Sequence, residues 1–186
     1  MKDKVLDAYK NKKLIGIYTD SINPNSFSVG YILHADENSY ILYNISPYGK
    51  FDGYSCELVE DIIKIEEDSK YLNNIQKLIN YYKLDVVDEM LFDDSKPIVF
   101  NFIEFIKSSN SICSILTDNS DIYDIVGFIK KYNKKSIEIL QIDSDSYEDG
   151  IIKINIDNIE KIVCSSNDEK KLEILYKLNN KYFLEN

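Results

Sequence analysis

The sequence predicts a mainly β protein with flanking helices (α+β), arranged as two tandem copies of one unit of helix, five strands and helix. The block Gly30-Tyr31-Ile32 recurs 97 residues later as Gly127-Phe128-Ile129. With the same offset, residues 28–78 match residues 125–175 at twelve identical positions. Short runs rich in Val, Ile, Tyr and Phe, which are typical of strands, fill both stretches. A match over this period indicates an internal repeat.

The predicted domains are residues 1–82 and residues 98–186, and residues 83–97 connect them. The connecting segment, KLDVVDEMLFDDSKP, has no counterpart in the repeat. Because it carries several apolar side chains, we expect it to pack against the domains.

A helix is expected at both ends of each copy, from apolar residues at helical spacing. The helices are predicted over residues 2–11, 69–82, 98–107 and 167–180. The third helix has the clearest start, because Asp93-Asp94-Ser95 offers N-cap side chains and Pro97 is tolerated in a first turn.

Five short strands are expected between the helices of each copy. They are predicted over residues 14–20, 27–34, 40–45, 54–59 and 62–66, and over residues 112–118, 123–130, 136–142, 151–156 and 159–164. Asp52-Gly53 and Asp149-Gly150 precede the fourth strand of each copy. Since glycine accepts positive φ freely, both pairs are predicted to form tight turns.

Two short motifs resemble those of the Sm-like small β-barrel family, which belongs to the SH3-like group. Gly30-Tyr31-Ile32-Leu33, followed by Asp36 and Asn38, is similar to the first motif, and residues 59–65 and 156–162 are similar to the second. The resemblance implies two closed five-stranded barrels. The Arg-Gly pair with which the family binds RNA is replaced here by acidic turns, so the resemblance implies the fold without RNA binding.

The charge of the chain restricts its partners. The 32 acidic residues outnumber the 22 basic ones, which are all lysine, and the net charge is -10. Arginine supplies the planar fork that grips phosphate and guanine, so its absence and the negative field disfavour nucleic acid. The acidity favours a basic protein partner.

Neither secretion nor membrane insertion is indicated. The N-terminus has no apolar signal region, and no segment approaches the roughly 18 apolar residues that a membrane helix needs. Cys56, Cys113 and Cys164 are odd in number and lack any C-x-x-C spacing, so neither a disulfide framework nor a zinc site is predicted. We expect a cytoplasmic protein whose cysteines are small buried hydrophobes.

No catalytic residue, cofactor or metal ligand is predicted, and the chain is not expected to be an enzyme. His34 is the single histidine, so every histidine-dependent site would have to include it. An alternative is a metal-dependent hydrolase that uses the carboxylates of Asp143–Asp149, since hard cations take several carboxylate oxygens from one loop. A solvated hairpin loop is the commoner interpretation of such a stretch.

Two groups of side chains are candidates for binding. Tyr48, Phe51 and Tyr54 could form an exposed aromatic anchor for a protein partner, or could cover the end of a barrel. The second group, a lysine-rich turn with one aromatic residue, could touch RNA or could discourage pairing between strand edges. Its members are Lys130, Lys131, Tyr132, Lys134 and Lys135.

The sequence therefore predicts a non-catalytic cytoplasmic protein-binding or regulatory module, of the immunity or antitoxin type, for a basic partner. The alternatives are an Sm-like RNA-binding protein that uses lysine and tyrosine surfaces, and the metal-dependent hydrolase.

Overall fold

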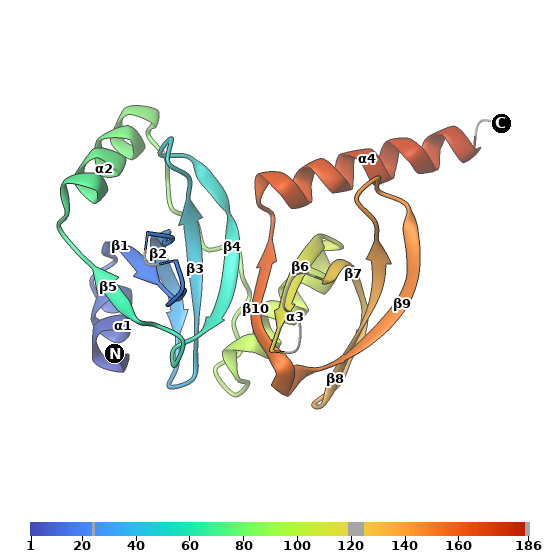
Figure 1. Cartoon of the computed structure of the whole chain (residues 1–186), viewed down its shortest axis with the longest axis horizontal. Coiled ribbons are helices and arrows are strands. Elements are labelled where there is room, and N and C mark those ends of the chain that lie inside the picture. The colour runs from blue at the N-terminus through green and yellow to red at the C-terminus, as the bar shows by residue number, and fades with distance from the viewer. Residues whose placement is uncertain (24, 119–124, 185–186) are drawn as a thin grey trace. The chain divides into compact units, whose positions relative to one another are not determined.

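The computed structural model describes residues 1–23, 25–118 and 125–184, with side chains up to residue 180 (Figure 1). The chain divides into two compact units, Met1–Asn101 and Phe102–Asn186. Helix α3 (Ile98–Ser109) crosses the boundary between them.

Unit 1 has two further helices, α1 (Lys2–Lys10) and α2 (Lys70–Tyr82), in its described residues. Its strands are β1 (Leu14–Tyr18), β2 (Ser28–Ala35), β3 (Ser39–Ile45), β4 (Phe51–Leu58) and β5 (Lys64–Glu66). They pair antiparallel in the order β5-β1-β2-β3-β4.

The described part of unit 2 contains α4 (Asn167–Leu184) and a short 3-10 helix, η1 (Ile156–Asn158). Its strands are β6 (Ile112–Thr117), β7 (Ile125–Tyr132), β8 (Ser136–Ile142), β9 (Glu148–Asn155) and β10 (Ile159–Cys164). They pair antiparallel in the order β10-β6-β7-β8-β9. The strand predicted over 123–130 begins in the structure at Ile125, and its first two positions lie outside the described residues.

The prediction of two closed Sm-like or SH3-like barrels is wrong. The described strands form an open antiparallel order in each unit, β5-β1-β2-β3-β4 in unit 1 and β10-β6-β7-β8-β9 in unit 2. Within the described residues, no ladder joins β4 to β5 or β9 to β10. The prediction of an internal repeat of two self-contained barrels is wrong for the same reason. The physical reason is that alternating side chains define the faces of a strand, whereas closure depends on which edges pair.

The prediction that the two Asp-Gly pairs form turns is also wrong. Asp52-Gly53 lies within β4 and Asp149-Gly150 within β9. Each glycine has positive φ, 83° in Gly53 and 94° in Gly150, at a shift in strand register. Glycine with positive φ suits a β-bulge as well as a turn, and the chain uses it for a bulge here. The turns lie earlier, at residues 46–50 and 143–147.

Side chains explain where two of the helices begin. Ser69 is the N-cap of α2, and its Oγ accepts a hydrogen bond from the backbone N–H of Leu72 at 3.2 Å. The backbone N–H of Ile98 in α3 donates to Asp36 Oδ2 at 3.3 Å. Asp36 lies between β2 and β3, so a distant turn supplies the cap that the sequence predicted from residues 93–95.

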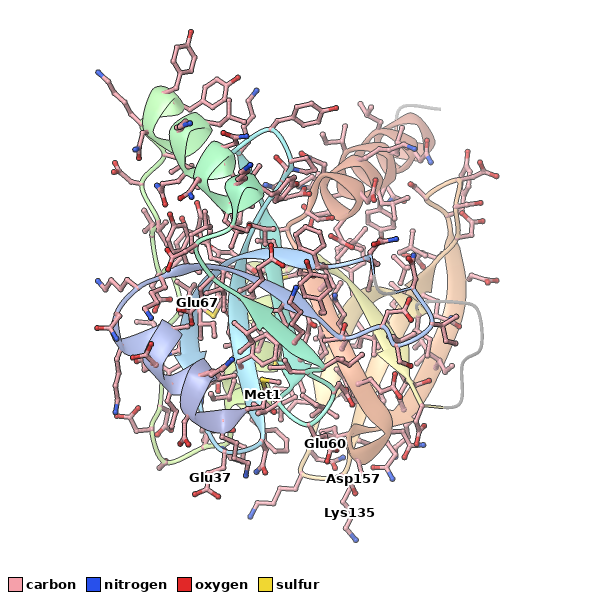
Figure 2. All side chains as sticks on the ribbon, turned by 60° about the vertical axis from the view of Figure 1, so that its left-hand side comes forward. Met1, Glu37, Glu60, Glu67, Lys135 and Asp157 are labelled. Carbon is pink, nitrogen blue, oxygen red and sulfur yellow. The ribbon has the colours of Figure 1, made fainter. Side chains whose placement is uncertain are left out.

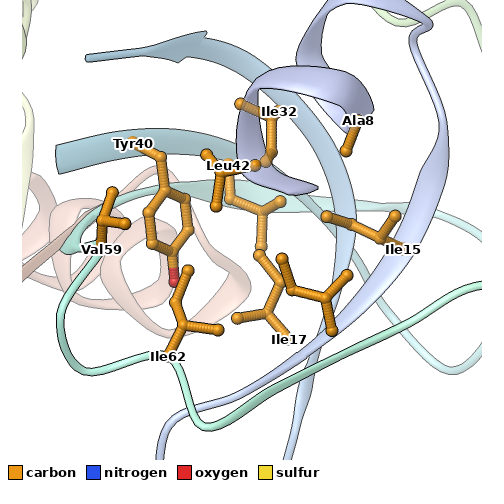
Figure 3. Packing of buried hydrophobic residues seen from close by; sticks show 10 residues of the cluster. Ala8, Ile15, Ile17, Ile32, Tyr40, Leu42, Val59 and Ile62 are labelled. Carbon is orange, nitrogen blue, oxygen red and sulfur yellow. The ribbon is translucent and has the colours of Figure 1, made fainter. Parts of the chain in front are cut away.

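The core of unit 1 lies between α1 and the strands (Figure 3). Its buried residues are Val5, Ala8, Ile15, Ile17, Ile32, Tyr40, Leu42, Val59, Ile62 and Ile65. Tyr40 brings a hydroxyl into this core, and the hydroxyl donates to Glu57 Oε2 at 3.0 Å. Glu57 Oε1 accepts from Ser55 Oγ at 2.7 Å. Burial raises the pKa of Tyr40 well above its usual range, and the nearby Glu57 carboxylate raises it further.

One hydrophobic cluster of unit 2 lies between α4 and the sheet. Buried Ile112, Phe128, Leu140 and Ile142 pack with Leu172 and Tyr176 of α4. Glu169, also on α4, is buried and accepts hydrogen bonds from Ser114 Oγ at 2.7 Å and from the backbone N–H of Ser166 at 3.0 Å. The same carboxylate thus holds β6 to the beginning of α4.

Candidate functional site

The connecting segment after α2 lies against unit 1 although residues 84–93 form no helix or strand. His34, near the end of β2, contacts the middle of this connecting segment. The His34 Nε2 and Asp88 Oδ2 atoms lie 2.6 Å apart, within hydrogen-bond distance. The His34 ring also stacks on the Phe92 ring. The single histidine is therefore a structural anchor in this arrangement.

Other contacts fix both ends of the segment. Tyr43 Oη on β3 donates to the backbone oxygen of Asp85 at 3.4 Å, and Met90 is buried. At the far end, the Asn101 side chain accepts from the backbone N–H of Asp93 at 2.9 Å and donates to the backbone oxygen of Asp93 at 3.1 Å. A stretch without regular structure is thus attached at several points.

We call residues 84–94 the acidic segment. It carries five carboxylates and no lysine, and its carboxylates are Asp85, Asp88, Glu89, Asp93 and Asp94. Between them, Leu91 is 97% exposed and Val87 is 51% exposed. The acidic segment therefore combines uncovered apolar side chains with concentrated negative charge. Burial raises the pKa of Tyr43, and the carboxylates of Glu89 and Asp85 raise it further.

A patch of exposed tyrosines directly precedes the acidic segment. Tyr81 and Tyr82, the last residues of α2, are 79% and 47% exposed, and their rings meet edge to face at 5.2 Å. Lys50 Nζ lies 5.2 Å from the centre of the Tyr82 ring. The turn that carries Lys50 also carries Tyr48, which is 74% exposed. We call Tyr48, Tyr81 and Tyr82 the tyrosine patch.

The three aromatic residues predicted as a partner anchor separate in the structure. Tyr48 is exposed, whereas Tyr54 is buried and Phe51 is half-buried. The Phe51 and Tyr54 rings lie 4.9 Å apart, and both pack against Tyr43. Exposed Tyr81 and Tyr82 were not among the predicted site residues, because their positions at a helix end carry no strand or turn signal.

The lysine-rich turn predicted as a possible RNA contact lies between β7 and β8. Lys131 Nζ is 4.0 Å from Glu138 Oε2, and Lys130 Nζ lies 5.7 Å from the centre of the Phe128 ring. Tyr132 is half-buried, with Lys107 Nζ 5.9 Å from its ring centre. Lys134 and Lys135 are exposed. The four lysines of this turn are therefore exposed, whereas Tyr132 is half-buried.

A hollow of about 520 Å³ adjoins this turn in unit 2. Its lining residues are Lys135, Ser136, Lys153, Ile154, Asn155 and Asp157. The side chain of Lys135 projects from the protein beside Asp157 (Figure 2). Across the described residues, neither Lys135 nor Lys153 has a carboxylate oxygen within ion-pair distance. Two cations therefore stand at this hollow.

The acidic loop between β8 and β9 uses its carboxylates within the fold. Asp143 Oδ1 accepts from the backbone N–H groups of Asp145 and Tyr147, at 3.0 and 2.8 Å. Glu148 Oε1 accepts from Tyr176 Oη at 2.7 Å. In the described part of the chain, no group of three or more His, Cys, Asp or Glu residues could hold a metal ion. The loop thus offers no assembled ligand set for the hydrolase alternative.

Two of the three cysteines meet in the fold. Cys113 on β6 and Cys164 on β10 are directly opposed in the antiparallel ladder, and both are fully buried. Cys56 is also buried but belongs to unit 1. No local pattern in the sequence indicates this juxtaposition, because 51 positions separate the two cysteines.

Comparisons with models of protein families, with curated proteins and with solved structures found no match. The helices in the described residues include none that is both long and apolar enough to cross a membrane.

Proposed function

We propose that this chain is a non-catalytic cytoplasmic protein that binds a basic protein partner through the acidic segment of unit 1. The observation that carries the proposal is the exposure of Leu91 and Val87 among five carboxylates in a segment that His34 holds in place. The tyrosine patch at the beginning of this segment extends the surface.

The apolar side chains would supply binding energy. A leucine that is almost wholly exposed loses most of its hydration cost when a partner covers it, which contributes about 1.5 to 3 kcal/mol. Tyr81 and Tyr82 add large rigid side chains of the kind enriched at interaction hot spots.

The carboxylates would select the partner. A segment with five acids, one of which, Asp93, is paired with Lys96 at 3.5 Å, repels an acidic protein and accelerates encounter with a cationic one. The remainder of the chain is also acidic, so its electrostatic field likewise attracts a basic partner. An inhibitor of the immunity or antitoxin type, which covers a cationic nuclease, would need such a surface.

The anchoring contacts support binding rather than a loose linker. Because Tyr43 and Asn101 already hold the backbone of the segment and His34 holds its side chains, less conformational entropy is lost when a partner orders it. All three cysteines are free thiols, which agrees with the reducing cytoplasm.

The test is affinity purification from the native host with three versions of the tagged chain. One is unchanged and one carries Asp85→Lys, Glu89→Lys and Asp94→Lys. The matched control carries Glu37→Lys, Glu60→Lys and Asp149→Lys, which change the net charge equally at exposed positions outside the segment.

We expect a stoichiometric basic protein with the unchanged chain and the control, and its loss with the segment variant. Once purified, that partner should bind a Leu91→Ser chain about tenfold to a hundredfold more weakly. Repeated absence of a stoichiometric protein, or equal loss with both triple variants, would contradict the proposal.

A second candidate function, contact with RNA, rests on the hollow beside Lys135 and Lys153 in unit 2. Two lysines without a carboxylate partner among the described residues could neutralise phosphates, although the net charge opposes such binding. Fluorescence anisotropy with a single-stranded uridine oligomer tests it. Affinity should fall steeply with salt and should be lost in Lys135→Glu/Lys153→Glu but not in Lys70→Glu/Lys171→Glu. Undetectable or salt-insensitive binding would exclude it.

A further inference from the structure

Cys113 and Cys164 occupy opposed positions in the ladder between β6 and β10, which lie side by side in unit 2 (Figure 1). Opposed residues in an antiparallel pair have Cα atoms about 4.5 or 5.5 Å apart. A disulfide requires a Cα separation of about 4.4 to 6.8 Å. The backbone of unit 2 therefore already holds the two cysteines at a distance that a disulfide can span.

The side chains also share one environment. Opposed residues in a ladder point to the same face of the sheet, and both of these cysteines are fully buried. Burial raises the pKa of the Cys113 thiol to about 12. Burial raises the pKa of Cys164 as well, and the nearby Cys113 sulfur raises it further. The two thiols are thus close together, protonated and slow to react while the unit is closed.

We propose that Cys113 and Cys164 form a reversible dithiol–disulfide pair, an oxidation site that links β6 to β10. The oxidant class is a small hydroperoxide such as hydrogen peroxide, because a bulky reagent would not reach buried sulfur. Cys56 lies in the other unit and is not part of the pair.

The reaction balances in two steps. The sulfur of one cysteine attacks a peroxide oxygen, the O–O bond breaks, and a sulfenic acid and one water form. The sulfur of the second cysteine attacks the sulfenic sulfur, the S–S bond forms, and the hydroxyl leaves as a second water. Two thiols lose two protons and two electrons, and one peroxide becomes two waters.

The geometry favours a bond that is easily reduced. Opposed Cβ atoms lie about 4.5 to 5.5 Å apart, whereas disulfides prefer about 3.5 to 4.5 Å. The strands must therefore approach slightly, and Cys113 must give up the hydrogen bond from its Sγ to the backbone oxygen of Gly127, at 3.5 Å. A bond that stores this strain reverts readily when thiol reductants return.

The same bond would change the stability of unit 2. It would close a loop that contains β7, β8 and β9, because these strands lie between the two cysteines in the chain. A loop of this length restricts the unfolded chain, but the strain in the folded unit offsets part of this gain, so the oxidised unit should melt only roughly 2 to 5 °C higher than the reduced one.

Two experiments test the proposal on the full chain. In the first, the reduced protein is treated with hydrogen peroxide, denatured, alkylated with iodoacetamide and digested for mass spectrometry. We expect a peptide cross-linked between Cys113 and Cys164, a total mass lower by two hydrogen atoms, and alkylation of Cys56 alone. The Cys56→Ala variant should form the same cross-link, and Cys113→Ala should form none.

In the second experiment, the unfolded reduced chain refolds in a buffer of oxidised and reduced glutathione, which removes the barrier of burial. Three pairings are possible among three cysteines. The Cys113–Cys164 disulfide should exceed either pairing with Cys56 by about tenfold or more, since the native register brings only these two together. Pairings in equal amounts, or sulfinic acid at Cys113 without any cross-link, would overturn the proposal.

Discussion

The His34 ring lies parallel to the Phe92 ring, with 3.8 Å between the ring centres and 8° between the ring planes. The residues come from different parts of the fold, since His34 belongs to β2 and Phe92 to the acidic segment. Together with the contact between His34 and Asp88, this stacking fixes a segment that has no backbone ladder of its own. The contact can therefore be tested separately from the sheet.

The first prediction concerns this anchor. His34→Ala removes both the stacking and the hydrogen bond, so the acidic segment should be cleaved by a protease at least about fivefold faster. His34→Phe keeps the stacking and should lie between the unchanged chain and the alanine variant. Limited proteolysis with mass spectrometry of the fragments measures both rates. Equal rates for all three chains would show that the histidine does not anchor the segment.

The second prediction concerns the hydroxyl within the core of unit 1. Tyr40→Phe leaves the buried Glu57 carboxylate without the hydrogen bond that the Tyr40 hydroxyl donates. The free energy of unfolding should fall by about 1 to 3 kcal/mol, measured by urea titration. Tyr48→Phe makes the same chemical change at an exposed position and should have no measurable effect. A Tyr40→Phe chain as stable as the unchanged one would argue against this hydrogen bond.

The third prediction concerns Ser146 in the turn before β9. Its φ is 68°, and its buried hydroxyl has no hydrogen-bond partner within the described residues. Ser146→Gly removes the strain and the unsatisfied hydroxyl, so the protein should become more stable by about 1 to 2 kcal/mol. Ser146→Ala removes the hydroxyl and keeps the positive φ, and its gain should be smaller. Thermal melts rank the three chains, and a less stable glycine variant would refute the explanation.

The fourth prediction concerns a close approach between β7 and β8. A Cβ added to Gly127 would overlap the backbone oxygen of Leu140. Because the backbone cannot move away without breaking the ladder, Gly127→Ala should cost about 3 kcal/mol or prevent unit 2 from folding. Gly150→Ala is the matched control: its φ is positive, but its Cβ would meet no atom within 4 Å. That variant should lose only about 1 kcal/mol, by circular dichroism in urea.

The fifth prediction concerns acid at the β1–β5 pair. The Lys64 ammonium, 2.6 Å from Glu66 Oε2, together with the hydroxyls of Ser69 and Tyr18, lowers the pKa of Glu66 to about 2. Because the folded pKa lies below the usual value of 4.5, this carboxylate stabilises the fold above that value. The contribution is lost as the pH falls towards about 2. Since the pair lies at the surface, its worth is at most about 1 kcal/mol.

Glu66→Gln isolates this effect. The variant should be less stable than the unchanged chain at neutral pH, and the difference should shrink as acid is added, in urea titrations from about pH 7 to about pH 3. Glu37→Gln, at an exposed position, should follow the unchanged chain throughout. A difference that is constant with pH would assign the loss to packing instead.

The sequence predicted the succession of helices and strands because each depends on local patterns. The strand over residues 159–164 has the predicted bounds, and α2 begins one residue after its predicted start because Ser69 caps it. The bulges at Gly53 and Gly150 were missed, since positive φ alone does not distinguish a bulge from a turn. Barrel closure was predicted wrongly because the pairing of edges is a property of the whole sheet.

The candidate sites were harder to predict than the elements. Tyr54 lies in an uninterrupted run of buried positions in β4, and only its contacts with Tyr43 and Phe51 show that it belongs to an aromatic cluster. The opposition of Cys113 and Cys164 depends on a ladder between distant strands, which no local spacing encodes. The acidic segment has no periodic pattern at all, and its exposure follows from where His34 holds it.

The lack of a backbone ladder in the acidic segment has a consequence for how such a protein can diverge. In a strand, a new side chain must suit both neighbouring strands, whereas Leu91 and Val87 face solvent and have no such constraint. Homologous chains could therefore acquire new specificity by exchanging these outward residues without repacking the sheet. The positions that should resist exchange are those that hold the segment, namely His34, Met90 and Phe92.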